Sequence, residues 1–95
     1  MNRETISGGL YSSLSFVRGD GNSGYNFWVQ KKSGNDSVDR QRGQSCAAEL
    51  VRFMRENNDP LALRGVVAAI QKKGEMGTIE IAFFTRLGQL IAAGA

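Results

Sequence analysis

Histidine is absent from this 95-residue sequence, and cysteine and proline occur once each. Without histidine the chain lacks the usual general base at neutral pH, the commonest metal ligand, and every Ser-His or Cys-His nucleophile pair. The lone cysteine, Cys46, allows no disulfide within the chain and offers no metal site. We therefore expect no catalytic residues, no metal site and no cofactor, and we predict that the protein is not an enzyme.

Long apolar runs are also missing. No stretch of the sequence approaches the ~20 apolar residues that are needed to span a bilayer. Residues 1–7 are polar and contain no apolar segment of the kind that directs export. Together with the single free thiol, these absences predict a cytoplasmic protein that does not engage a membrane.

The sequence has only a mild excess of positive charge, because its twelve Lys and Arg and nine Asp and Glu give a net charge of +3. An excess of this size permits contact with phosphate or with an acidic partner but does not require it. The length fits one domain. We expect a flexible N-terminal tail over residues 1–9 and a single α+β domain over residues 10–95.

The first half of the domain alternates between apolar and polar residues in two short runs, around 10–17 and 25–30. Such alternation is typical of strands that are buried on one face. The intervening residues 18–24 contain Asp-Gly and three glycines, which favour a turn. The sequence therefore predicts a β-hairpin.

Three helices are predicted after the hairpin, over about 36–57, 60–73 and 78–93. Asp36 or Ser37 can cap the first helix, and Asp59 before the only proline can cap the second. Gly74 is a natural residue to end that second helix. The third helix is the most apolar, so we expect it to lie at the centre of the core with the hairpin packed on it. The predicted fold is a small single α+β domain, a β-hairpin followed by three helices (ββααα).

Two helical residues stand out. Gly43 lies on the apolar arc of the first helix, where it either allows close backbone approach or precedes the true start of the helix. Glu80 lies within the apolar stripe of the third helix, where a buried carboxylate needs compensation. It can accept a hydrogen bond from the Gly77 backbone, pair with Arg64 or Arg40, or act as a catalytic acid. A lone carboxylate makes poor chemistry, which favours the first two roles.

The outward face of the hairpin is the candidate partner-binding site. If Leu14 and Phe16 point into the core, Trp28 points away from it and lies near cationic residues at the strand ends. Such a surface is typical of a protein interface anchor, and it is also what stacking on a nucleobase requires. The alternative is that a helix or the tail covers Trp28 and makes it part of the core. The residues predicted to bind the partner are Tyr11, Arg18, Tyr25, Trp28, Lys31 and Lys32.

The function predicted from these observations is that of a small non-catalytic accessory or regulatory protein that binds another protein. A homodimer joined through the hairpins would satisfy the exposed strand edges. The alternative is a nucleic-acid-binding protein that uses the aromatic and basic face of the hairpin. A helix-turn-helix formed by the second and third helices is disfavoured, because the first two turns of the third helix carry no basic residue.

Overall fold

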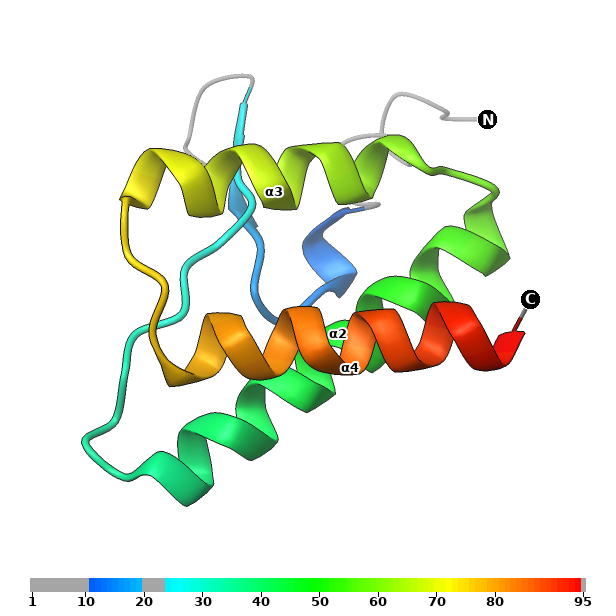
Figure 1. The fold of residues 1–95 in the computed structure, drawn as a ribbon. Coiled ribbons are helices and arrows are strands. Elements are labelled where there is room, and N and C mark those ends of the chain that lie inside the picture. Colours follow the sequence, from blue (N-terminus) through cyan, green and yellow to red (C-terminus); the bar gives the residue numbers. More distant parts are fainter. Residues whose placement is uncertain (1–10, 20–23, 95) are drawn as a thin grey trace.

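The computed structural model describes residues 11–19 and 24–94, and over these residues the predicted ββααα order is confirmed (Figure 1). A short 3-10 helix precedes two strands and three helices. The predicted tail and the centre of the predicted turn, residues 20–23, lie outside the described residues. The elements are η1 (Tyr11–Ser13), β1 (Arg18–Gly19), β2 (Tyr25–Asn26), α2 (Asp36–Asn57), α3 (Leu61–Lys73) and α4 (Thr78–Gly94).

The hairpin is shorter than the alternating pattern predicts. Its antiparallel register pairs Arg18 with Asn26 and Gly19 with Tyr25. The predicted strand over residues 10–17 is wrong, because η1 occupies its start and the chain then turns: the Val17 backbone N–H donates to the Leu14 carbonyl oxygen at 3.2 Å. A pattern of alternating burial therefore arises here from turns, without a ladder of strand hydrogen bonds.

The helix ends follow the predicted capping chemistry with shifts of one residue. Asn35 caps α2, because its side chain accepts a hydrogen bond from the Val38 backbone N–H at 3.1 Å. At the start of α3, Asp59 Oδ1 accepts from the Leu61 N–H at 3.1 Å. Gly74 follows α3 with a φ of 78°, a left-handed conformation that glycine adopts without strain.

α2 and α4 cross closely at Gly43 (Figure 1). A side-chain carbon at this position would overlap the Ile79 carbonyl oxygen and would lie 2.9 Å from the backbone nitrogen of Phe83, both in α4. Gly43 is buried inside α2, so the helix does not begin after it. Of the two interpretations of Gly43, close approach of the helix backbones is therefore confirmed.

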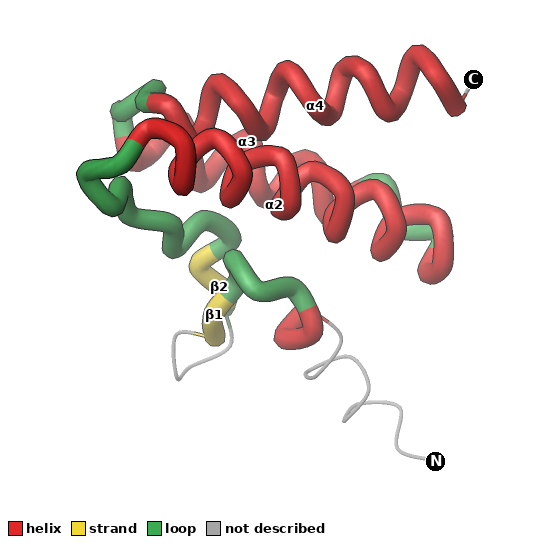
Figure 2. Tube along the Cα trace, turned by 90° about the horizontal axis from the view of Figure 1, so that it is seen from below, coloured by secondary structure: helices red, strands yellow, loops and turns green. Residues whose placement is uncertain are grey.

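α4 does not lie at the centre of the core, which corrects the sequence prediction. Figure 2 shows α4 on one side of the molecule and the strands on the other, with α2 and α3 between them. The apolar residues of α4 are spread around the helix, so that Ile81 and Ile91 are 55% and 53% exposed. The hairpin segment reaches α4 through Trp28, whose ring centroid lies 5.0 Å from that of Phe83.

Candidate functional site

Trp28 is buried, with 4% of its surface exposed, so the outward orientation is wrong and the alternative, a covered Trp28 in the core, is the one that the structure has. Its indole contacts Phe16 and Phe83, at centroid distances of 5.6 and 5.0 Å. The indole N–H donates to Glu80 Oε2 at 2.8 Å, so its polar atom is satisfied inside the protein. Strand alternation fails here because β2 ends at Asn26, whose side-chain oxygen accepts a hydrogen bond from the Trp28 backbone at 3.1 Å.

Glu80 is a buried carboxylate that is fully compensated. Besides Trp28, it accepts a hydrogen bond from the Gly77 backbone N–H at 2.9 Å and lies 3.4 Å from Lys73 Nζ. The predicted contact with Gly77 is confirmed, whereas the cationic partner is a lysine and not an arginine. Burial on its own raises the pKa of Glu80. The hydrogen bonds from Trp28, from its own backbone and from Gly77, with the Lys73 charge, outweigh burial and hold the pKa below its ordinary value of 4.5.

Tyr11 makes internal contacts. Its hydroxyl donates to Asp59 Oδ2 at 2.5 Å, and its ring lies 5.2 Å from the rings of both Tyr25 and Phe27. The hydrogen bond to Asp59, with partial burial and the Asp59 charge, raises the pKa of Tyr11 to about 12. Tyr11 therefore packs inside the protein against Tyr25, Phe27 and Phe53, and its direct contact with a partner stays a prediction.

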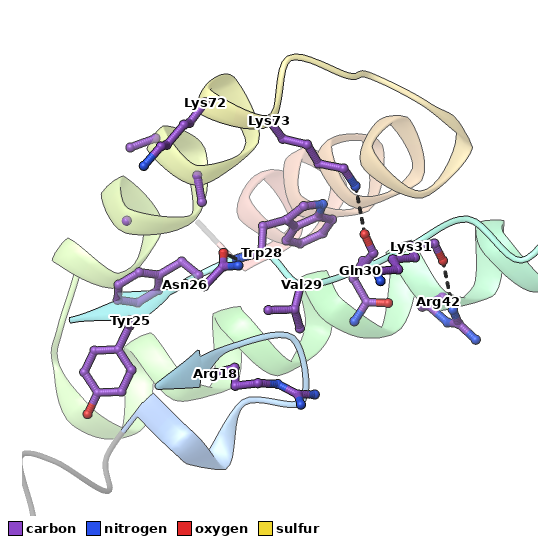
Figure 3. Close-up of a pocket in the computed structure, with 14 residues that line it drawn as sticks. Arg18, Tyr25, Asn26, Trp28, Val29, Gln30, Lys31, Arg42, Lys72 and Lys73 are labelled. Atoms are coloured by element: carbon purple, nitrogen blue, oxygen red, sulfur yellow. Dashed lines mark hydrogen bonds between the residues drawn. The ribbon is translucent and has the colours of Figure 1, made fainter. Parts of the chain in front are cut away.

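A groove of about 1180 Å³ lies beside these buried residues, between α3 and the chain that runs through β2 and beyond it (Figure 3). Residues 25–31 form one wall. The last three turns of α3 form the other wall, where small side chains leave the space open. The remaining lining comes from β1 and α2. The lining residues outside 25–31 are Arg18, Arg42, Gly65, Ala68, Ala69, Lys72 and Lys73.

The groove is strongly cationic. Arg18, Lys31, Arg42, Lys72 and Lys73 line it, and no carboxylate of the described residues does. These side chains come from β1, from the chain after β2, from α2 and from the end of α3, so they surround the groove on several sides (Figure 3). A concave site lined by charges of one sign focuses the electrostatic potential and attracts the opposite charge.

Two of these cations also hold the groove together. Lys73 Nζ donates to the Gln30 carbonyl oxygen at 2.8 Å, in addition to its ion pair with Glu80. An Arg42 guanidinium nitrogen donates to the Lys31 carbonyl oxygen at 3.3 Å. Both interactions tie the wall formed by residues 25–31 to the helices (Figure 3). The groove is therefore built from side-chain contacts to backbone carbonyls as well as from apolar packing.

The structure brings together four of the six predicted site residues, namely Arg18, Tyr25, Trp28 and Lys31. Tyr11 does not line the groove. Lys32 lines a separate cavity of about 260 Å³ at the start of α4, to which Lys73 also contributes.

The sequence analysis missed the contribution of α3. Its Lys72 and Lys73 stand in the last helical turn, where cations complement the helix macrodipole. Because this role at the helix end accounts for both lysines, their presence in the sequence did not indicate a binding site. A row of small residues one and two turns earlier, Gly65, Ala68 and Ala69, is the signal that could have marked this side of α3 as a wall.

The described residues offer little other chemistry. Cys46 is buried and unpaired, and burial raises its thiol pKa to about 12, with Glu49 adding to the shift and Arg42 opposing it. Within 11–19 and 24–94, no three His, Cys, Asp or Glu side chains are grouped to hold a metal ion. None of the helices described is both long and apolar enough to cross a bilayer.

No protein-family model, curated protein or solved structure matches the chain.

Proposed function

We propose that the protein is a non-catalytic nucleic-acid-binding protein, and that its groove holds the sugar-phosphate backbone. The observation that carries this proposal is the set of five cations that line the groove without a carboxylate among the described residues. The whole chain has nine acids against twelve bases, so this local separation of charge exceeds what the composition implies. Lys and Arg contacts to phosphates supply most of the affinity of such proteins.

The size of the groove supports a polymeric ligand. Pockets for small molecules usually measure ~300–1000 Å³. This groove, at about 1180 Å³, exceeds that range, and cations lie along it from Arg18 to Lys72. A chain of phosphates can contact several of these cations at once. We also propose a cytoplasmic location, which the unpaired Cys46 supports.

A protein partner, the function expected first from the sequence, has less support. That expectation relied on exposed aromatic anchors, and Trp28 and Tyr11 both make internal contacts. A homodimer joined through the hairpins remains a separate proposal; the exposed Ile81 and Ile91 lie on α4, on the side away from the strands, and do not bear on that interface. Sedimentation equilibrium over a range of protein concentrations tests the homodimer. A dimer requires an average mass that rises toward, or stays at, twice the monomer mass, and a constant monomer mass contradicts it.

The nucleic-acid proposal is tested by fluorescence anisotropy of labelled oligonucleotides at about 50 and 200 mM salt. If four cations each neutralise one phosphate, affinity for a single strand falls ~50-fold over that range, because counterions are released on binding. Lys72→Gln and Lys31→Gln should each weaken binding at low salt and reduce the steepness of the salt dependence. Each substitution should reduce the slope of the salt dependence by about the contribution of one phosphate contact.

Arg52→Gln is the matched control, because Arg52 is an exposed cation on α2 that does not line the groove. It changes the net charge by the same amount and should leave the salt dependence unchanged. If the control weakens binding as much as the groove variants do, the attraction comes from overall charge and the groove is not the site. Absence of salt-dependent binding to any oligonucleotide contradicts the proposal.

A further inference from the structure

The two walls of the groove carry apolar side chains as well as cations. Phe27, Val29, Ala68 and Ala69 contribute apolar surface to the lining. Phe27 packs directly on the α3 backbone at Gly65, where a side-chain carbon would lie 3.0 Å from the ring. The aromatic ring is thus held against the helix. A ligand that only offered phosphates would leave the apolar surface of the walls unused.

An aromatic pair stands at one end of the groove. Tyr25 and Phe27 are both half-buried, and their ring centroids lie 5.7 Å apart. Tyr11 packs edge-on against both rings, and its own position is secured by the hydrogen bond to Asp59. Figure 3 shows Tyr25 beside the groove, at the opposite end from Lys31 and Arg42. Rings that are held in place in this way lose little entropy when a planar ligand stacks on them.

The shape of the site distinguishes between paired and unpaired nucleic acid. A duplex presents phosphates on its outer surface, and its base edges are reached by a helix or strand that protrudes into a groove of the nucleic acid. Here the protein surface is concave, and its apolar residues lie in the same walls as its cations. Bases can reach apolar side chains inside such a groove only when they are unpaired and free to turn toward them.

We infer that the groove binds nucleic acid as an unpaired strand, with phosphates at Arg18, Lys31 and Lys72 and a base stacked at Tyr25 and Phe27. This inference rests on the proposed function and adds the class of nucleic acid to it. Tyr25 would act as the stacking residue and Tyr11 as its positioning residue. Tyr25 and Phe27 are half-buried beside the groove, whereas Trp28, which the sequence places on the outward face, is enclosed.

The experiment compares three labelled ligands of equal length, ~16 nucleotides, which covers the usual site size. They are a single-stranded oligothymidylate, a duplex, and an abasic strand that keeps the phosphates but lacks the bases. Anisotropy titrations at low salt measure the three affinities. Charge alone favours the duplex, because its phosphates are more closely spaced. A preference of about tenfold or more for the thymidylate over both other ligands therefore reports contact with bases, since stacking contributes on that scale.

Two variants at one position sharpen the comparison. Tyr25→Leu removes the ring and should lower the affinity for thymidylate by about tenfold, toward that of the abasic strand. Tyr25→Phe keeps the ring and should bind like the wild type. Circular dichroism and the emission maximum of the buried Trp28 verify that both variants fold.

The outcomes separate the inference from the proposed function. If the duplex or the abasic strand binds as tightly as thymidylate, the inference is overturned while nucleic-acid binding stands. A folded Tyr25→Leu variant that keeps full affinity overturns the inference in the same way. If polyglutamate competes as well as thymidylate at equal charge, the site is a general acidic-polymer site and both proposals fail.

Discussion

At the residue scale, Glu80 joins the segment after β2 to the connection between α3 and α4. Its carboxylate contacts Trp28 in the segment after β2, Lys73 at the end of α3, and Gly77 just before α4. Trp28 and Glu80 are 52 positions apart in the sequence. A buried indole N–H that loses its acceptor carries the full penalty of desolvation. The Glu80 side chain therefore provides one of the attachments between the groove wall and the helices, beside those of Lys73 and Arg42.

Glu80→Gln should lower the free energy of unfolding by ~1–3 kcal/mol. Glutamine keeps only one acceptor oxygen, so it cannot satisfy both Trp28 and Gly77, and it loses the ion pair with Lys73. Urea unfolding near pH 7, followed by Trp28 fluorescence, measures the change. Glu75→Gln is the control, because Glu75 is exposed in the loop before α4 and should change stability by less than ~0.5 kcal/mol. Equal effects of the two substitutions would contradict this account.

Residue-level prediction from the sequence succeeded where the chemistry is local. The Glu80 carboxylate and the Gly77 N–H are three positions apart, so helix capping rules identify the contact. The Trp28 environment depends on a carboxylate contributed by a distant helix. No pattern around Trp28 itself indicates that the core contains an acceptor for its N–H, and so the choice between exposed and buried stayed open.

At the scale of the element, the crossing of α2 and α4 depends on Gly43. Gly43→Ala should destabilise the protein by ~2 kcal/mol or more, because the added methyl group overlaps the α4 backbone, which cannot rotate away as a side chain would. Gly88→Ala is the matched control in α4, since no atom lies within 4 Å of its added carbon. It should stabilise by ~0.5–1 kcal/mol, the usual gain of alanine over glycine in a helix.

Thermal unfolding of both variants and the wild type measures whether the two substitutions change stability in opposite directions. A neutral or stabilising Gly43→Ala substitution would mean that the helices are farther apart than described. The pair uses the same chemical change in one buried and one exposed setting, so intrinsic helix propensity cancels from the comparison.

Elements differed in how well the sequence predicts them. The ends of the three helices match the predictions within about one residue, because caps, glycine and proline act locally. The strands do not match, since η1 and a turn produce the same alternating burial as a strand over residues 13–16. The sequence predicts a central position for α4 because α4 is the most apolar helix. In the structure, apolar residues of α4 such as Ile81 are exposed, so this prediction is wrong.

At the scale of the whole molecule, acid should weaken the fold partly through Glu80. Its pKa lies below 4.5 in the folded protein, so the unfolded chain binds protons more readily in the acid range. The stability that Glu80 provides is complete above pH ~4.5 and is lost as the pH falls through the lower folded-state pKa. Unfolding free energies at about pH 7, 5 and 3 should decline in the wild type and decline less steeply in Glu80→Gln. Parallel slopes in the two proteins would assign the acid sensitivity to other carboxylates.

The groove is a property of the whole molecule and could be predicted only in part. The cations of the hairpin segment, Arg18 and Lys31, could be identified because both lie at the ends of the predicted strands. Arg42, Lys72 and Lys73 join them only after α2 and α3 have packed against that segment. Each of these three residues has an ordinary local explanation, so the cationic lining becomes visible only when the segments are assembled.

Lys73 has a further consequence, because the same ammonium group lines the groove and neutralises a buried acid. Its side chain is 29% exposed, so a phosphate in the groove can compete with Glu80 and with the Gln30 carbonyl for it. A ligand that draws Lys73 outward would raise the proton affinity of Glu80 and loosen one attachment of the wall formed by residues 25–31. Ligand occupancy and proton uptake would then be linked in a single equilibrium, with Trp28 placed to report both.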